Sequence, residues 1–308
     1  MGFGVMFHHF DSEQHILRPG SISAEEFDRL LSHLRNDFAV LDPDVFLQHL
    51  LAGTLRETDI ILSLDDSLLS QFDVAVPVLD SHGLKAVFNV YSSVFTGDPD
   101  PLELFAIFRA SEFESFDDYW ERFLAAAEEL KPGLEMTLEK SFPTEWLSNF
   151  PFYSVNERKF RFLRDRLLTK EEYLVVMFDL INRSPSFDPQ RAVDSAWMKS
   201  EHLKVLLAAG HSVGLHSHTH PTQMADLSES EQLFEYVTNK EWIESELHVT
   251  PAWVAHPCGN YSKVTLQILE RLGVQGGFRS SLTPGYFGSP LEVPREDHAN
   301  IMRKILDT

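Results

Sequence analysis

Short apolar runs alternate along the chain with segments in which apolar residues recur every three or four positions. The runs predict buried strands at 3–7, 59–64 and 85–90. The recurring pattern predicts helices at 23–34, 44–52 and 71–81, and a capping box of Ser23 and Glu26 opens the first. This strand–helix–strand order is typical of a parallel α/β fold.

The same alternation returns from residue 196 onward. It predicts helices at 197–210, 228–247 and 262–273, and strands at 212–217, 252–256 and 274–281. Residues 96–190 interrupt it, because they are rich in Phe, Glu and Asp and mostly helical in pattern. We expect a single domain over residues 1–308 with a helical insertion at about 96–190. The alternative is that these helices are an ordinary part of the main domain.

Composition and charge narrow the class of protein. The chain has 308 residues, of which 43% are hydrophobic, and this is enough to build one large core. Its formal net charge of −21 disfavours nucleic acid and anionic membranes as general partners. One local arginine or a metal ion still allows an anionic small substrate.

Cysteine usage and the apolar runs indicate a compartment. The single cysteine, Cys258, excludes an internal disulfide bond and fits a reducing environment. The N-terminus lacks the basic start and long apolar run of a signal peptide. No stretch approaches the roughly 18 consecutive apolar residues of a membrane helix. We therefore expect a cytoplasmic protein without a membrane span.

The densest group of chemically active side chains is the segment His216–His220, which holds three histidines directly after a predicted strand. Imidazole is the commonest metal ligand and suits zinc well. If the segment turns helically, His216 and His220 share one side; if it stays extended, His218 joins them on one face. The segment therefore indicates a metal site.

A second feature is the pair Asp65–Asp66, which follows the predicted strand at 59–64. Adjacent acids at a strand end point in different directions, so one can bind a metal while the other acts as a base. The carboxyl ends of strands are where sites form in α/β folds. Taken alone, the pair also fits a solvated turn or a helix cap.

Four segments taken together resemble the polysaccharide deacetylase (NodB-homology) family: LSLDDS, KAVFNV, GHSVGLHSHTHP and WVAHPCGNYS. Their order and spacing match the family's Thr-Phe-Asp-Asp-Gly motif, the strand after it, the His-Ser/Thr-x-x-His motif and the Arg-x-Pro-Tyr turn. The resemblance covers roughly residues 55–94 and 200–295. It implies a distorted (β/α) barrel of about seven strands, a deacetylase-type catalytic domain, and a site at the carboxyl ends of the strands.

The resemblance also implies roles for individual residues. Asp65 corresponds to the general base, and Asp66, His216 and His220 correspond to the ligands of a divalent metal, with zinc expected. Three such ligands leave open positions for water and substrate. The backbone N–H of Cys258 corresponds to the donor that stabilises the oxyanion.

The chain also departs from the family pattern. Ser67 replaces the glycine of the first motif, and Ala255 replaces the arginine of the third. Cys258 replaces the tyrosine, but a backbone N–H survives that change. The missing arginine leaves the base without its usual partner, and we expect Arg295 to pair with Asp65 instead.

The family's Leu-x-His acid motif is also absent, so other histidines are candidates for protonating the leaving amine. His298 is the first of them, and His8 and His9 can either do this or line the pocket. We further expect His256 and Arg279 to contact substrate.

These observations predict a metal-dependent hydrolase that removes an N-acyl group, acetyl or formyl, from a sugar. A cytoplasmic location favours a small precursor, such as a nucleotide-linked or lipid-linked sugar, over a mature polymer. Two alternatives stay open. One is a metal hydrolase of the PHP or amidohydrolase type, in which His216 and His218 are ligands. The other is a non-catalytic sugar-binding protein of the same fold.

Overall fold

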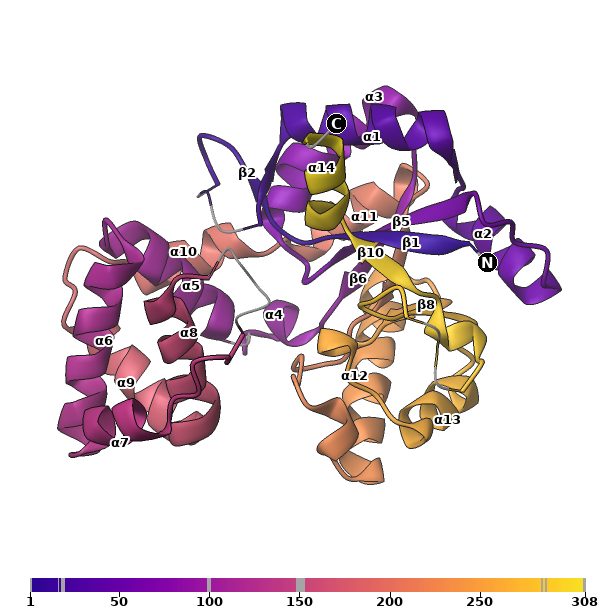
Figure 1. The fold of residues 1–308 in the computed structure, drawn as a ribbon. Helices are drawn as coiled ribbons and strands as arrows, with labels where there is room; N and C mark the ends of the chain where they lie inside the picture. The colour runs from indigo at the N-terminus through magenta and orange to yellow at the C-terminus, as the bar shows by residue number, and fades with distance from the viewer. Residues whose placement is uncertain are drawn as a thin grey trace. The chain divides into compact units, whose positions relative to one another are not determined.

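The computed structural model describes residues 2–15, 17, 20–98, 101–147, 153–283, 285 and 287–306. The chain forms two compact units (Figure 1). One unit comprises residues 1–100 and 196–308, and the other comprises residues 101–195. No helix in the described part of the chain is long and apolar enough to cross a membrane.

The first unit is built on a parallel sheet with the strand order β10-β1-β5-β6-β7-β8-β9. Phe278 at the end of β9 also pairs in parallel with Val293, just before β10, so the sheet nearly closes on itself. These strands are β1 (Phe3–Phe7), β5 (Asp59–Asp65), β6 (Ala86–Val90), β7 (Ser212–Leu215), β8 (Trp253–Ala255), β9 (Gly276–Phe278) and β10 (Arg295–Asp297). The predicted distorted (β/α) barrel of about seven strands is confirmed.

Three two-residue strands were not predicted, because they are too short to show an apolar pattern. β4 (Ala39–Val40) pairs with the first residues of β5, next to the stretch that pairs with β6. β2 (Phe10–Asp11) pairs with β3 (Ile22–Ser23) in a separate sheet.

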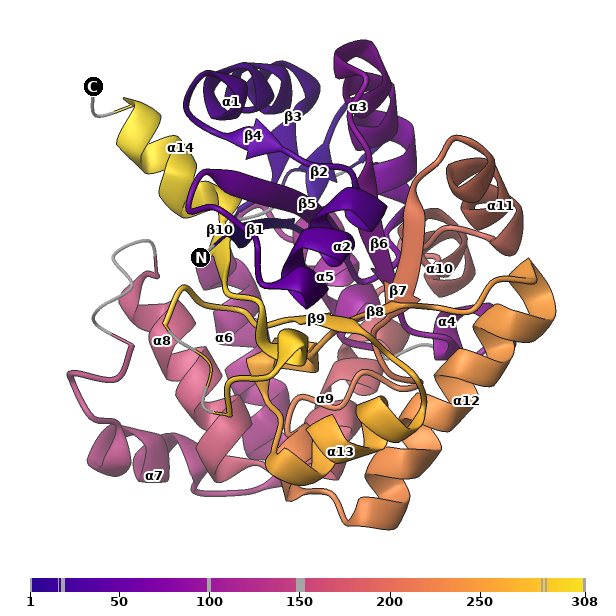
Figure 2. The ribbon, with the colours of Figure 1, turned by 90° about the vertical axis from the view of Figure 1, so that its right-hand side faces the viewer.

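Helices follow most strands of this unit and surround the sheet (Figure 2). They are α1 (Ala24–Asp37), α2 (Pro43–Ala52), α3 (Val76–His82), α4 (Ser93–Thr96), α11 (Ser200–Ala208), α12 (Glu229–Leu247), α13 (Lys263–Arg271) and α14 (His298–Leu306). The capping box of Ser23 and Glu26 begins α1, as its spacing predicts. One wider helical turn, Gln71–Ala75, precedes α3.

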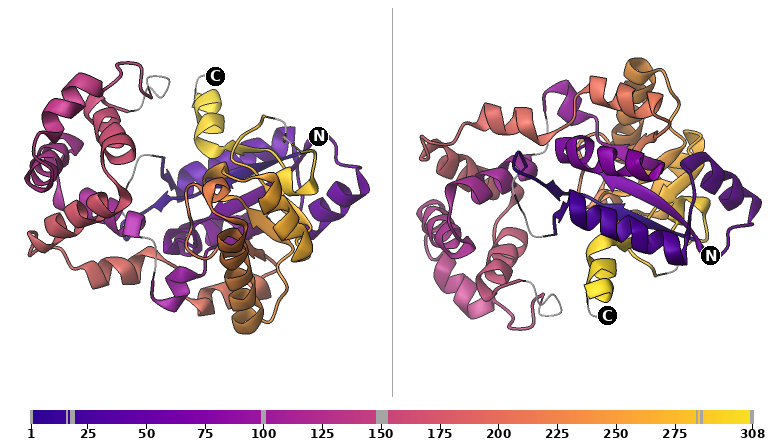
Figure 3. Two further views of the ribbon diagram at one scale, coloured as in Figure 1. Left: turned by 90° about the horizontal axis from the view of Figure 1, so that it is seen from below. Right: turned by 90° about the horizontal axis from the view of Figure 1, so that it is seen from above.

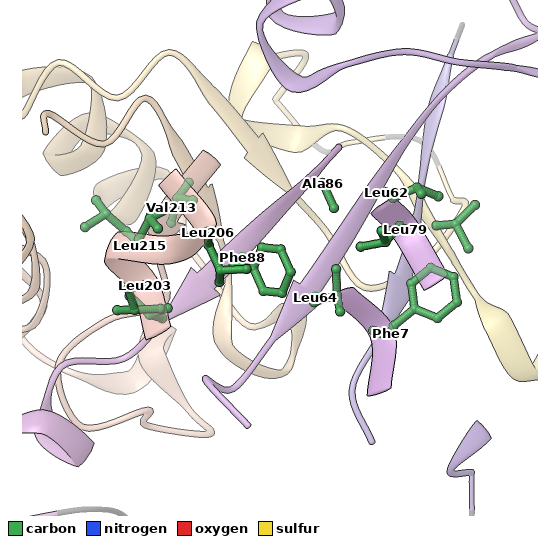
Figure 4. Close-up of a cluster of buried hydrophobic side chains, with 14 of the residues drawn as sticks. Phe7, Leu62, Leu64, Leu79, Ala86, Phe88, Leu203, Leu206, Val213 and Leu215 are labelled. Carbon is green, nitrogen blue, oxygen red and sulfur yellow. The ribbon is translucent and has the colours of Figure 1, made fainter. Parts of the chain in front are cut away.

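Alternate residues of the strands point to opposite faces of the sheet and form two cores. On the outer face, Leu62, Leu64 and Phe88 pack against helix residues such as Leu79 and Leu206 (Figure 4). The second core contains the inward-facing Ile61, Val87, Trp253, Phe278 and Val293, together with Phe46 of α2. The inward-facing positions of these strands continue beyond this core toward the carboxyl ends of the strands.

The second unit consists of helices over its described residues and appears in magenta to salmon in Figure 3. They are α5 (Pro101–Glu112), α6 (Phe116–Leu130), α7 (Leu134–Ser141), α8 (Val155–Phe162), α9 (Lys170–Asn182) and α10 (Pro189–Ala196). A wider turn, Leu163–Leu167, prolongs α8. Rings of Phe108, Tyr119, Phe123, Phe160 and Tyr173 fill its interior. Its place within a single catalytic domain stays a prediction.

Candidate metal centre and active site

The inward face of β5 changes from apolar to polar toward the carboxyl end of the strand. Ile61 belongs to the inner core, whereas Ser63 and Asp65, two and four residues later, are buried polar groups. Asn89 follows Val87 on β6 in the same way. Because parallel strands end at one edge, these polar side chains meet at the carboxyl end of the barrel.

The turn after β5 separates the two acids. Asp66 has a φ of 80° and Ser67 has a φ of 60°, so both lie in the left-handed region that favours glycine. This turn ends the strand abruptly, and it leaves Asp65 inside the barrel while Asp66 faces the histidines. Ser67 occupies the position where the resemblance expects glycine. The left-handed φ explains why glycine is preferred there, and holding a serine in this conformation costs about 1 kcal/mol, which the fold tolerates.

The histidine segment folds back over Asp66 through two more left-handed residues. Ser217 has a φ of 66° and His220 has a φ of 55°. The result places Nε2 of His216 3.2 Å and Nε2 of His220 3.5 Å from Oδ1 of Asp66. The two imidazole centroids are 4.8 Å apart.

These three side chains fit a metal ion. One ligand atom from each of Asp66, His216 and His220 lies within 4.8 Å of the other two. Ligand atoms around a tetrahedral zinc ion are separated by about 3.4 Å, given metal–ligand bonds of about 2.1 Å. Oδ1 of Asp66 is buried and receives no well-directed hydrogen bond, which leaves it available to a cation.

The protonation states of the ligands support the same conclusion. Burial raises the pKa of Asp66, but the neighbouring His216 and His220 outweigh burial and bring this pKa far below its usual range. Burial lowers the pKa of His220 to about 4, so its ring is neutral near pH 7. Burial opposes protonation of His216 as well, but Asp66 and Asp65 raise its pKa overall. A cation that binds there must displace this proton.

Helix α12 holds the histidine segment in place with two buried polar residues that the sequence analysis missed. Glu235 accepts hydrogen bonds from the backbone N–H groups of His218 and Thr219, at 2.8 and 2.7 Å, and from the Thr219 hydroxyl. Asn239, one turn later, accepts from the backbone N–H of His216 at 3.0 Å. The sequence signal for Glu235 and Asn239 is that polar residues occupy positions on the buried face of α12.

The carbonyl group of Ala255, at the end of β8, fixes the orientation of the His216 ring. Nδ1 of His216 lies 2.8 Å from the carbonyl oxygen of Ala255 and donates its proton there, so Nε2 is the nitrogen that faces Asp66. Such outer contacts orient metal-binding imidazoles and raise their affinity.

Asp65 is held by two donors from different strands. Nη1 of Arg295 lies 2.8 Å from Oδ2, and Nδ2 of Asn89 donates to Oδ1 at 2.8 Å. Burial by itself raises the pKa of Asp65, but the positive charge of Arg295 contributes most to lowering it below its usual range. Asp65 is therefore an ionised carboxylate inside the barrel.

Asn89 is the register partner of Asp65 on the adjacent strand, and Gly214 is the partner of Asn89 on the next. A side chain at Gly214 would collide with Oδ1 of Asn89, so this glycine makes room for the amide. Asn89 is the one polar residue in the otherwise apolar strand β6, and this is the sequence signal that could have identified it.

Arg295 is itself fixed by several groups. Its Nη1 donates to Oγ of Ser63 at 3.0 Å, its Nε donates to the carbonyl oxygen of Arg279 at 2.6 Å, and its guanidinium lies 5.4 Å from the Phe278 ring centroid. Gly4 leaves space for its stem, because a Cβ there would lie 2.9 Å from its Cγ.

Among the remaining predicted histidines, His8 lies close to Asp65. Its Nε2 is 3.9 Å from Oδ2 of Asp65, and its side chain is 33% exposed. It also lies within electrostatic range of Asp66 and His220, so it borders both parts of the site. His9 is half-buried next to it in sequence, directly after β1.

His298 is enclosed. Its ring is 4% exposed and stacks on Phe7 at 5.3 Å between centroids. Burial is the main cause that lowers its pKa, which favours a neutral ring. This environment is unfavourable for a group that must arrive protonated.

His256 and Arg279 are also turned inward. His256 is 1% exposed, donates from Nε2 to the carbonyl oxygen of Leu291 at 2.9 Å, and stacks on Tyr261. Burial lowers its pKa to about 4. The guanidinium of Arg279 is buried against Thr283, to which it donates hydrogen bonds. Their predicted contact with substrate stays a prediction.

Cys258 and His218 are the last two residues that the sequence singled out as candidates for the site. Cys258 is exposed and takes a φ of 53° directly after Pro257, at the carboxyl end of β8. His218 has Nδ1 2.9 Å from Oγ of Ser92, and its ring packs edge-on to Phe234. It does not join the ligand group found among the described residues, so the geometry of the PHP-type alternative is absent there.

The fold and the site define a nearly closed parallel barrel with an Asp–His–His group at the carboxyl ends of its strands. Residues 181–277 match the model of the polysaccharide deacetylase family. The predicted resemblance to this family is therefore confirmed. The match includes His216 and His220 but ends short of Arg295 and begins after Asp66. No curated protein matches the chain.

Solved structures show the same fold at low identity. The Streptococcus pyogenes deacetylase PplD, in complex with acetate, is 16% identical with a TM-score of 0.55, covering 97% of this chain and 96% of that one. IcaB from Ammonifex degensii is 15% identical with a TM-score of 0.57, covering 98% and 95%. The BpsB deacetylase domain from Bordetella bronchiseptica is 13% identical with a TM-score of 0.53, covering 96% and 95%.

Proposed function

We propose that this protein is a metal-dependent hydrolase that removes an N-acyl group, acetyl in the first instance, from a sugar. One observation carries the proposal: Asp66, His216 and His220 converge while the adjacent Asp65 is held ionised by Arg295. A ligand group beside a positioned carboxylate is what metal-assisted amide hydrolysis requires.

Asp66, His216 and His220 would hold the metal, with zinc proposed because two imidazoles and a carboxylate suit it. When bound, such an ion polarises the acyl carbonyl and lowers the pKa of water. The chain contributes the neutral ring of His220 and the fixed orientation of His216 through Ala255.

Asp65 is the proposed general base. Its carboxylate accepts from Asn89 and Arg295 and still has acceptor capacity for a proton from water. The two donors orient the carboxylate, so its position is set before substrate arrives. The backbone N–H of Cys258 is the proposed donor to the developing oxyanion.

His8 is the proposed group that protonates the leaving nitrogen. It lies 3.9 Å from Asp65 and is partly exposed, whereas His298 is sealed against Phe7. An acid must reach the substrate from the open side of the site, and His8 meets this requirement better.

The test is release of acetate from a panel of N-acetylated substrates, comprising nucleotide-linked sugars, lipid-linked sugars and oligomers of N-acetylglucosamine. N-formylated analogues, read out as formate, decide between the two acyl groups. The metal-loaded wild type should release acid from one class, and Asp65→Asn should reduce kcat by about 10²- to 10⁴-fold. Sugar and metal binding without any release would favour the non-catalytic sugar-binding alternative.

A separate measurement tests the metal site. His220→Ala should lose bound metal on purification, measured by elemental analysis. Full metal occupancy in this variant would mean that the ligand set is wrong.

A further inference from the structure

The helical unit contains a basic segment that contrasts with the rest of the chain. Six of the 26 Lys and Arg residues lie within residues 158–170, together with a single acid, Asp165. This segment carries a net charge of +5, although the whole chain carries −21. Charge of one sign that gathers in a chain of the other sign indicates an anionic partner for that surface.

The fold brings an arginine from another helix to this segment. The guanidinium carbon of Arg109, on α5, lies 5.7 Å from the ring centroids of Phe116 and Tyr119. That of Arg164 lies 5.7 Å from the ring of Phe160. Phe160 in turn contacts Phe116 and Tyr119, at 5.7 and 5.5 Å between centroids. Arg109 and Arg164 therefore lie over the same group of rings.

Arg161 is the third member, and we name these residues the Arg109–Arg161–Arg164 cluster. Its guanidinium carbon lies 4.1 Å from the ring centroid of Tyr153. Burial is the main cause that lowers the pKa of Arg161, and the positive charges of Arg164 and Arg109 lower it further. Arg161 and Arg164 lie three residues apart on α8 and the turn that prolongs it, so their side chains are neighbours on the helix surface.

Little of this charge is neutralised within the protein. Arg164 forms a two-point ion pair with Asp165, at 2.5 and 3.1 Å. Among the described residues, Arg109 and Arg161 have no carboxylate within ion-pair distance, and all three arginines are half-buried. Half-buried cations without counter-ions reduce stability, and a bound anion would remove that cost.

We propose that the Arg109–Arg161–Arg164 cluster is a binding site for a doubly charged phosphate group, such as a diphosphate or a phosphate monoester. Three guanidinium groups and one carboxylate leave a net charge of +2, which matches such a dianion. Contact with Tyr153 and the neighbouring rings positions the guanidinium groups. Arg109 and Arg161, which form no ion pair among the described residues, can offer their N–H edges to phosphate oxygens, which arginine binds in a two-point manner, while Arg164 adds charge beside them. The site lies within the helical unit, and it does not depend on the proposed deacetylation.

A purely structural role makes a different prediction. Arginine stacked on rings can serve only to cover apolar surface with its stem. In that case substitutions would change stability and leave anion binding unaffected.

The experiment titrates the full-length protein with inorganic pyrophosphate in a calorimeter, in parallel with His220→Ala. Because His220→Ala removes a proposed metal ligand, binding that persists in it does not occur at the metal centre. Arg161→Gln should weaken binding about tenfold or more, since it removes charge-assisted hydrogen bonds. Arg161→Lys keeps the charge without the fork and should give an intermediate value.

The matched control is Arg122→Gln, an exposed arginine of the same unit. It should bind pyrophosphate within twofold of the wild type, and circular dichroism should show all variants folded. Equal losses in Arg122→Gln and Arg161→Gln, or binding that Arg161→Gln leaves unchanged, would overturn the proposal.

A second arm identifies how the phosphate is presented. Phosphatidylcholine vesicles with and without phosphatidic acid are sedimented with each variant. Loss of vesicle binding in Arg161→Gln alone supports the site with a lipid phosphate as ligand, and pyrophosphate binding without vesicle binding supports it with a soluble one. Absence of both kinds of binding in the wild type would overturn the proposal.

Discussion

Nη1 of Arg295 lies 2.8 Å from Oδ2 of Asp65, although 230 residues separate them along the chain. Both side chains are at most 2% exposed. The guanidinium enters from β10, on the far side of β1 from β5. A cationic partner for the Asp65 carboxylate is therefore supplied from a different strand of the same barrel.

Arg295→Met should destabilise the fold by about 3–5 kcal/mol, because it leaves the Asp65 carboxylate buried without its cation. Urea unfolding of the metal-free protein measures this. The double variant Asp65→Asn/Arg295→Met should recover much of the lost stability while remaining inactive. Wild-type stability in Arg295→Met would contradict a buried ion pair.

Asn89→Leu should lower kcat by about 10- to 100-fold with unchanged metal content, because the base loses one of its two orienting donors. Gly214→Ala should reproduce part of this effect, since the added methyl group displaces the Asn89 amide. Steady-state kinetics measures kcat, and elemental analysis measures the metal content of each variant. A change in KM alone would place Asn89 in substrate binding instead.

Glu235→Gln should weaken metal binding about 10- to 100-fold, because it loosens the backbone of His218 and Thr219 next to the ligands. Competition with a chromophoric chelator gives the affinity. The control is Glu241→Gln, an exposed glutamate of the same helix, α12, which should keep wild-type affinity. The idea fails if both variants bind metal equally well.

His8→Gln should reduce kcat about 10²-fold or more if His8 protonates the leaving nitrogen, and metal content should stay unchanged. His298→Gln should have a smaller effect on kcat and a larger one on stability, since its ring packs on Phe7. Acetate release and thermal unfolding are measured on both. The reverse order of effects would assign the acid to His298.

His211 should make stability depend on pH far from the site. Its Nδ1 accepts from the backbone N–H of Ala86 at 3.2 Å, and burial lowers its pKa from 6.5 to about 4. Between these values the unfolded state binds more protons, so this contribution is complete above about pH 6.5 and is lost as the pH falls toward 4. The loss is at most ~3 kcal/mol.

The measurement is urea unfolding of the wild type and His211→Gln between pH 4 and 7.5, both with a chelator present. The variant should lose part of the slope, and His256, whose pKa is also about 4, should supply some of the remainder. Identical slopes in both proteins would show that His211 is not held neutral.

The sequence by itself determined the features that depend on neighbouring residues. Capping at Ser23 and the apolar runs of β1, β5 and β6 act within a few residues, so their patterns predict the elements directly. The acid pair and the histidine segment are contiguous as well. Because parallel strands end at one edge, their meeting could be expected before the fold was known.

Only the tertiary structure decided which distant groups touch. The sequence made Arg295 a candidate partner of Asp65, but the two meet only because β10 lies beside β1. Asn89 faces Asp65 because of the register between β5 and β6. Glu235 reaches the histidine segment from a helix that begins after it. The sealing of His256 and His298 likewise follows from barrel closure and helix packing. Such contacts depend on register and closure, which are long-range properties that no local pattern encodes.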